Sequence, residues 1–327
     1  MMRWLTMLAL TAVLAGAPGA GRAQEADPAT QVEDIIVTAR RSGAPMWEIT
    51  QDDRTLILVG AITPPRELDW RPDALEAATL RADRILFPQR GQASMTDVLR
   101  LIWRIRTISN LPAGTTTADY LEPEWQARLE AVMAGERSQR WRTTNFVPLS
   151  IDLLNDKAGF SRRTGAGPDD VVRRAARRAR VPVTPVGVIR GDELIDGLIN
   201  APPSTYAPCV EAAIVAAEGG PEMTLARAEA WRRFRVAEVA ASPIDSALDV
   251  CWPWGDPEVA PLLRGQWDEA LNQALAQPGV TLAVAPIRLL ARSGGVLDAL
   301  EARGLQIEGP EWRPITQPTG DAADSDS

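Results

Sequence analysis

The sequence predicts an α/β (α+β) fold, in which a mixed β-sheet is covered by helices and the middle of the chain is rich in helix. Short β-prone runs such as Thr55–Val59 and Arg84–Phe87 alternate with longer segments whose apolar residues recur at helical spacing. The 327 residues and a hydrophobic content of 45% are enough for a sizeable core. We expect a single globular domain over residues 45–312.

The first elements of this domain are predicted from turn residues and prolines. Two β-prone runs, 46–50 and 55–59, flank the turn-like Gln51-Asp52-Asp53 and predict a β-hairpin. Pro72 suits the first turn of a helix, and Pro88 stops the short strand Arg84–Phe87. Apolar residues at helical spacing predict a further helix over 95–105, and Pro123 opens another.

The remaining elements follow the same logic. A loop over 161–168 precedes a helix that starts with Asp169-Asp170, and 181–188 reads as a strand with two prolines. Helices are expected over most of 205–241 and over 258–276, where Gly279 ends the pattern. The C-terminal part is expected to form a buried strand, a helix after Gly294-Gly295 and a last strand, at 280–287, 296–304 and 305–309.

The N-terminus has the pattern of an export signal. Met1-Met2-Arg3 is a basic start, Leu5 to Ala15 is apolar, and small residues precede a cleavage point after Ala23. Residues 1–23 are therefore predicted to be a signal peptide, and the protein to be periplasmic or secreted. Later apolar runs are short, so no transmembrane segment is expected after its removal.

The two ends of the domain carry polar tails. Residues 24–44 are predicted to be flexible, and 313–327 to be a disordered acidic tail. Within the first, "VEDIIVTARR" resembles the TonB box of outer-membrane receptors, so Ile35, Ile36 and Val37 would pair with a TonB-like partner by strand addition. The alternative is a disordered tail with one β-prone patch.

Composition excludes several function classes. The chain has no histidine and a net charge of −8. Histidine-based catalytic triads are therefore impossible, and the commonest transition-metal ligand is missing. The acidic balance argues against nucleic acid as a partner. No phosphate-binding glycine loop is found, so no cofactor is predicted.

Two cysteines, Cys209 and Cys251, are the only ones in the chain. In an exported protein such a pair favours a disulfide bond, because the compartment is oxidising. The alternative is two separate buried thiols.

Two strand ends have matching layouts. In "LILVGAIT" Gly60 lies at the turn and Thr63 three residues later, whereas in "TLAVAPIRLL" Ala285 lies at the turn and Arg288 three residues later. The second corner leads into a glycine pair, a helix and a strand.

This layout resembles the TraB/GumN family, which includes the Tiki proteases and the pheromone-shutdown proteins. That family has a Gly-x-x-His motif after a strand near each end of its domain, a glutamate after the second strand and another after a mid-chain strand. Four stretches carry the resemblance, which covers about residues 45–310: "MWEITQDDRTLILVGAI", "LDWRPDALEAATLRADRILF", "GPDDVVRRAARRARVPVTPVGVIRGDELIDGL" and "VTLAVAPIRLLARSGGVLDALEARGLQIEG".

The family's site positions fall here on residues of a different kind. At the position of the family's turn glycine this chain has Gly60. The positions of the family's polar site residues fall at Thr63, Pro88, Gly187 and Arg288. A metal-dependent hydrolase needs converging imidazoles or carboxylates, which none of these supplies. No catalytic or metal-binding residue is therefore assigned. Arg288 is a candidate contact for an anion, or it pairs with a local carboxylate.

Three hypotheses follow from this pattern. The first is an exported, catalytically degenerate TraB/GumN-like protein that binds an unknown envelope protein or small ligand. The second is a metal-dependent hydrolase with a site rebuilt from carboxylates, although pairs such as Asp169-Asp170 more often mark helix starts. The third is an envelope protein associated with a TonB system.

Overall fold

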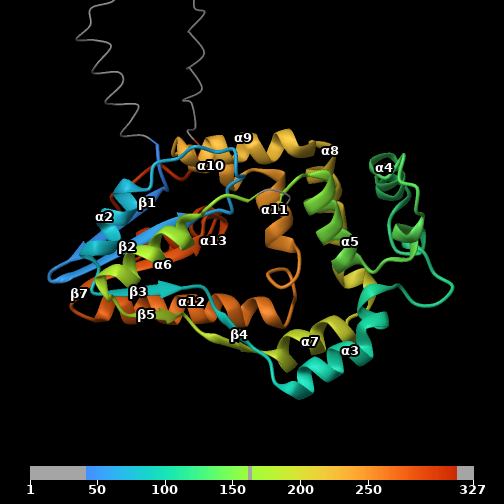
Figure 1. The fold of residues 1–327 in the computed structure, drawn as a ribbon, viewed down its shortest axis with the longest axis horizontal. Coiled ribbons are helices and arrows are strands. Elements are labelled where there is room, and N and C mark those ends of the chain that lie inside the picture. Colours follow the sequence, from blue (N-terminus) through green and yellow to red (C-terminus); the bar gives the residue numbers. More distant parts are fainter. Residues whose placement is uncertain (1–41, 161–163, 315–327) are drawn as a thin grey trace, which may run out of the picture. The chain divides into compact units, whose positions relative to one another are not determined.

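The computed structural model describes residues 42–160 and 164–314 (Figure 1). The predicted signal peptide, most of the predicted N-terminal tail with its TonB-box-like patch, and residues 315–327 lie outside the described residues. Packing contacts begin before the first strand: Ala44 is buried, and the Gly43 amide donates to the Arg232 carbonyl at 3.1 Å.

A five-stranded mixed sheet organises the chain, in the order β1 (Met46–Gln51), β2 (Arg54–Ala61), β7 (Gly279–Pro286), β3 (Arg84–Phe87) and β5 (Val183–Pro185). β1 and β2 form the predicted antiparallel hairpin, and the other neighbours pair in parallel. Asp52 has φ +51° at the hairpin turn, a conformation that aspartate tolerates better than most residues. The predicted α/β fold is confirmed.

Helices cover this sheet and share its core. α2 (Asp73–Arg81) contacts α6 (Pro168–Ala179), and α12 (Val259–Ala276) contacts β2. After β7 follow α13 (Ile287–Ala291) and α14 (Val296–Ala302). Three fully buried tryptophans, Trp47, Trp231 and Trp267, belong to this core.

The predicted helix-rich middle forms a second core. It is built mainly by α4 (Pro123–Val132), α5 (Phe146–Asp152), α8 (Ala207–Glu218) and α11 (Pro243–Val250). α9 (Gly220–Arg232) and α10 (Val236–Ala240) connect α8 to α11, and short turns of helix lie at Thr117–Asp119, Arg140–Thr143, Leu153–Lys157 and Pro203–Tyr206. The predicted disulfide is confirmed, because Cys209 of α8 is bonded to Cys251, directly after α11.

The stretch predicted as one strand over 181–188 is two strands in different sheets. β5 ends at Pro185, and β6 (Val188–Arg190) pairs in parallel with β4 (Arg90–Gln92) as a separate two-stranded sheet. β4 leads into α3 (Met95–Ser109) and β6 leads into α7 (Gly191–Asn200). These two helices contact each other away from the five-stranded sheet (Figure 1).

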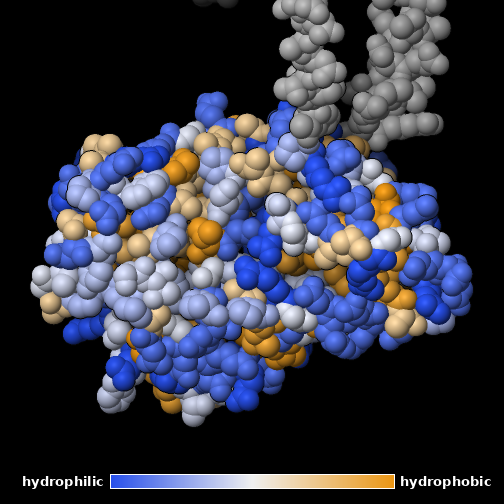
Figure 2. Space-filling view, turned by 180° about the vertical axis from the view of Figure 1, so that it is seen from behind, coloured by the Kyte–Doolittle hydropathy of each residue, from blue (hydrophilic) through white to orange (hydrophobic). Residues whose placement is uncertain are grey.

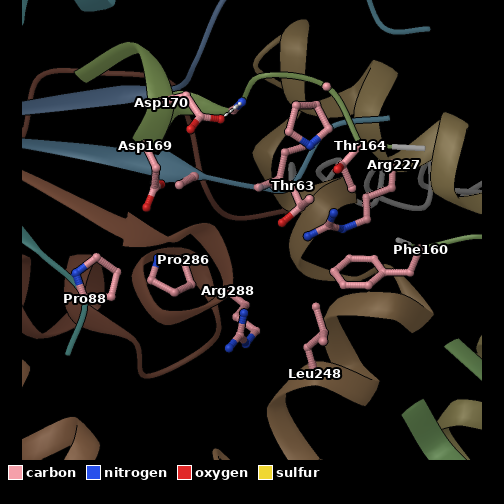
Figure 3. A pocket seen from close by; sticks show the side chains of 15 residues that line it. Thr63, Pro88, Phe160, Thr164, Asp169, Asp170, Arg227, Leu248, Pro286 and Arg288 are labelled. Atoms are coloured by element: carbon pink, nitrogen blue, oxygen red, sulfur yellow. Dashed lines mark hydrogen bonds between the residues drawn. The ribbon is translucent and has the colours of Figure 1, made fainter. Parts of the chain in front are cut away.

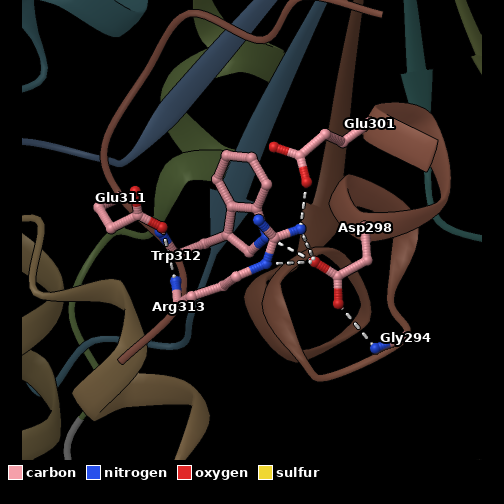
Figure 4. A network of polar contacts seen from close by, with 6 residues as sticks. All are labelled: Gly294, Asp298, Glu301, Glu311, Trp312 and Arg313. Atoms are coloured by element: carbon pink, nitrogen blue, oxygen red, sulfur yellow. Dashed lines mark hydrogen bonds and ion pairs between the residues drawn. The ribbon is translucent and has the colours of Figure 1, made fainter. Parts of the chain in front are cut away.

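The last predicted strand, 305–309, is wrong: only an isolated bridge joins Glu308 to Glu48. Side chains hold the C-terminal segment instead. The Trp47 indole donates to the Pro310 carbonyl at 2.8 Å. The Trp312 indole donates to Asp298 of α14 at 2.9 Å, and Arg313 bonds Asp298 at 2.7 Å and also bonds Glu301 (Figure 4).

The surface is mixed in character on the face that Figure 2 shows, where hydrophobic residues lie in small groups among hydrophilic ones. Among the helices described here, none combines the length and the apolar character that crossing a membrane requires.

Candidate functional site at the ends of β2 and β7

The two matching corners lie next to each other. β2 and β7 pair in parallel with Gly60 directly opposite Ala285, so the two chain segments leave the sheet at the same edge. This edge, at the carboxyl ends of neighbouring parallel strands, is where α/β proteins commonly bind ligands.

Gly60 is required by close packing. A Cβ atom at this position would lie 3.0 Å from Trp47 Cζ3 and 3.1 Å from Ile287 Cγ1. The Gly60 carbonyl also accepts a hydrogen bond of 2.7 Å from the indole of Trp231. The corner is thus fixed by tryptophans of the sheet core.

A cavity of about 380 Å³ opens where the corners end (Figure 3). Thr63, Pro88 and Arg288, three of the four positions predicted from the sequence, line it. The fourth, Gly187, is not among the lining residues and lies against the side chain of Gln266. The other residues that use their side chains at this cavity include Phe160, Thr164, Asp169, Asp170, Arg227 and Leu248.

Arg288 is held at the cavity by one carboxylate and one ring. Its Nε lies 3.4 Å from Asp249 Oδ1, and its guanidinium lies 5.3 Å from the centre of the Trp254 ring. Its side chain is only 13% exposed, and this burial lowers the pKa of Arg288 despite the nearby aspartates. An arginine does not lose its proton in a protein, so Arg288 keeps its positive charge at this buried position.

Arg227 is the functional candidate that the sequence did not reveal. It comes from α9, outside the four stretches that carry the family resemblance, and no local motif marks it. Asp245 of α11 binds its Nε and Nη2 in a fully buried pair, which leaves Nη1 outside that pair. The Phe160 ring lies 5.8 Å from the guanidinium, and Figure 3 shows Arg227 reaching the cavity beside Thr63.

Positive charge exceeds negative charge on this side of the cavity. Asp249 lies near three arginines, because Arg292 Nη1 is 3.7 Å from it and Arg264 also acts on it electrostatically. Asp245 is engaged by Arg227, so two aspartates face four arginines here. Burial raises the pKa of Asp249 although the arginines oppose this, so neither partner of the Arg288 pair is fully compensated.

The opposite wall of the cavity carries two carboxylates from the start of α6. Asp170 accepts a hydrogen bond of 3.1 Å from the Gly167 amide and caps the helix, as the sequence predicts for a helix start. Asp169 points into the cavity in Figure 3. Burial raises the pKa of Asp169, and the charge of Arg173 opposes the rise. The position of both aspartates at this cavity was not predicted.

These residues do not fit a divalent metal ion. Two carboxylates face two arginines across the cavity, Asp170 is engaged as a helix cap, and threonine is a weak ligand by itself. Within residues 42–160 and 164–314, no group of three or more acidic or cysteine side chains is placed to hold a metal. Hydrogen-bonding and charge-pairing groups dominate the site.

Comparison with protein-family models matches residues 45–309 to the TraB/PrgY/gumN family. The matched region contains both corners and every cavity residue named above. No curated protein and no solved structure gives a significant match.

Proposed function

The chain belongs to the TraB/PrgY/gumN family, and from this premise we propose that it is an exported, catalytically degenerate member that binds an anionic ligand in the cell envelope. The observation that carries the proposal is Arg288, which lines the cavity beside Thr63. The family resemblance assigns to Arg288 the place of the second motif histidine.

Arginine at this position opposes metal-dependent hydrolysis. Such hydrolysis needs a bound cation to polarise the substrate or to lower the pKa of a water molecule. A guanidinium is permanently charged, so it repels a divalent cation and cannot accept a proton from water. Arg227 adds a second positive charge at the same cavity.

The same groups suit a carboxylate or a phosphate. A guanidinium offers parallel N–H donors to two oxygens of an anion, and Nη1 of Arg227 remains outside its pair with Asp245. The hydroxyls of Thr63 and Thr164 line the cavity as well and can donate to such oxygens. Arg227 and Arg288 line one side of the cavity, and an anion would bind on that side, away from Asp169 and Asp170.

The binding half of the proposal is tested by titration calorimetry with inorganic phosphate and with acetate at low salt. We expect Arg288→Gln to weaken binding about tenfold or more, because a charge-assisted bond of about 1.5–3 kcal/mol is lost. Arg233→Gln is the matched control, since Arg233 is exposed and pairs with Glu229 outside the cavity. Equal affinity in wild type and Arg288→Gln would contradict anion binding at this site.

The catalytic half is tested by a hydrolysis assay on peptide substrates with and without added Zn²⁺, Mn²⁺ or Co²⁺. We expect no metal-stimulated turnover. Turnover that appears with metal and disappears in Asp169→Asn would instead support the second candidate, a metal-dependent hydrolase rebuilt on carboxylates.

One observation favours that second candidate: Asp169 and Asp170 line the same cavity as Thr63 and Arg288. A buried carboxyl with a raised pKa is also a common form of general acid. The helix-capping role of Asp170 and the two facing arginines make the metal-dependent hydrolase the less favoured of the two candidates.

Export is supported by two features. The N-terminal segment has the pattern of a signal peptide, and the Cys209–Cys251 disulfide is typical of an oxidising compartment. Cell fractionation with thiol labelling tests it: the protein should appear in the periplasm or medium with both cysteines protected. Recovery in the cytoplasm with two free thiols would contradict export.

A further inference from the structure

Helix α3 differs from every other long helix described here, because none of its residues is buried. Its large apolar side chains are nevertheless numerous. Trp103 is 87% exposed, Met95 76%, Ile102 63% and Leu99 62%. Val98, Leu101 and Ile105 are exposed as well. Single exposed apolar residues are ordinary, but seven on one helix of 15 residues indicate an interaction surface.

The apolar residues form one face of the helix. Met95, Leu99 and Ile102 follow each other at intervals of four and three residues, and Val98 and Ile105 lie beside them. Trp103 and Leu101 lie at the two margins of this stripe. The helix therefore has an apolar face, which Arg106 interrupts near the C-terminal end, and an opposite polar face.

The polar face, not the apolar one, packs on the neighbouring helix. Arg100 pairs with Asp196 of α7 at 2.5 Å. Asp97 lies so close to the start of α7 that a Cβ on Gly191 would be 2.7 Å from its Oδ2. α3 and α7 lie side by side in Figure 1. The polar side of α3 therefore faces α7, and its apolar side faces away from α7.

The charges of α3 are also unusual for an acidic protein. The helix carries three arginines and one aspartate, and that aspartate, Asp97, belongs to the capping box with Ser94. Arg100 pairs with α7, whereas no ion pair is found for Arg104 or Arg106 among the described residues. Arg106 is exposed and continues the apolar stripe four residues after Ile102, whereas Arg104 lies on the side of Asp97 and Arg100. An apolar face that contains a tryptophan and an exposed arginine is typical of helices that lie in the interface of an anionic membrane.

We propose that α3 is a membrane-contacting helix, whose apolar face rests in the headgroup region of an anionic phospholipid surface. With 15 residues and four charges the helix is unsuited to cross a bilayer, so it would lie along the surface. Trp103 would sit at headgroup depth, and Arg106, at the C-terminal end of the apolar stripe, would reach lipid phosphates. The membrane contact does not depend on what the cavity binds.

The test is co-sedimentation with vesicles made of equal parts phosphatidylglycerol and phosphatidylcholine. Wild type and every variant are expressed from the whole 327-residue sequence and purified after any processing by the cell. The N-terminal segment is then the same in all samples. The double variant Leu99→Ser/Ile102→Ser should reduce the partition coefficient about tenfold or more, because two inserted apolar side chains are lost.

A matched control carries the same chemical change elsewhere. Leu80→Ser/Leu225→Ser replaces two exposed leucines, on α2 and α9, and should leave vesicle binding unchanged. Arg106→Gln should weaken binding about fivefold on the anionic vesicles, and not on pure phosphatidylcholine. Arg104→Gln, on the side of Asp97 and Arg100, removes the same charge and should have the smaller effect. Circular dichroism of each variant checks that the fold is kept.

Two outcomes would overturn the proposal. One is equal vesicle binding by wild type and Leu99→Ser/Ile102→Ser. The other is absence of vesicle binding together with a dimer, seen by analytical ultracentrifugation, that the same double variant abolishes; the apolar face would then join two copies of the chain.

Discussion

The corner after β2 and the corner after β7 occupy equivalent places in the sheet, yet they are stabilised by different interactions. Gly60 is fixed by packing, because Trp47 and Ile287 leave no room for a Cβ and Trp231 bonds its carbonyl. Ala285, its partner in register, carries a Cβ and is fully buried. Three residues further on, Thr63 meets the cavity with a hydroxyl and Arg288 with a charge.

The difference separates what the fold requires from what the chemistry requires. The turn residues are determined by the core, so a site can lose its reactive side chains without losing its shape. The positions three residues later, Thr63 and Arg288, line the cavity. We therefore expect stability to depend on the turn residues, and ligand binding to depend on Arg288.

The largest effect is expected where the glycine corner meets the core. Trp231→Ala should lower the free energy of unfolding by about 3–5 kcal/mol, because a fully buried indole and its bond to the Gly60 carbonyl are removed. Urea unfolding followed by circular dichroism measures the change. Trp103→Ala is the control, since this indole is 87% exposed and its loss should change stability by less than about 0.5 kcal/mol.

Exchanging glycine and alanine at the two turns should change stability less than Trp231→Ala does. The two substitutions should also differ from each other in size. Gly60→Ala should destabilise the protein by about 1–3 kcal/mol, because Trp47 and Ile287 must shift to admit the Cβ. Ala285→Gly should destabilise it by about 1 kcal/mol, through lost burial and a more flexible unfolded chain. If urea unfolding shows Gly60→Ala to be neutral, the packing account of this corner is wrong.

The sheet and its corners were the most predictable part of the molecule. Short β-prone runs, turn residues and Pro88 marked the hairpin and the strand Arg84–Phe87, and strands of this kind are defined by nearby residues. The short segment around Glu308 failed as a strand because a single bridge, rather than a ladder, joins it to β1. Pairing with a distant partner is decided by packing, which local patterns do not report.

The site was predictable only in part for the same reason. Thr63, Pro88 and Arg288 follow strands, so the parallel register brings them together. Arg227 comes from α9, whose buried residues Ala228, Ala230 and Trp231 belong to the sheet core, and it reaches the cavity only through this packing. Likewise, the spacing of apolar residues predicted the helix α3 correctly, but spacing does not show that its apolar face is left uncovered.

The smallest effect is expected from Asp169, which faces the two corners from α6. Burial raises the pKa of its carboxyl above the ordinary value of 3.8, so the folded protein binds this proton more readily than the unfolded chain. Its contribution to stability is therefore present at low pH and is lost as the pH rises from about the ordinary value through the raised one.

Asp169→Asn should remove this fall, so that the free energy of unfolding declines less steeply over the same acidic interval in a pH series of urea titrations. Arg173→Gln should have the opposite effect and steepen the fall, because the charge of Arg173 holds the pKa of Asp169 down. Identical slopes in wild type and Asp169→Asn would show that this carboxyl is as well solvated in the folded protein as in the unfolded chain. The aspartate side of the cavity would then be open to water, and only the arginine side would remain as a buried binding surface.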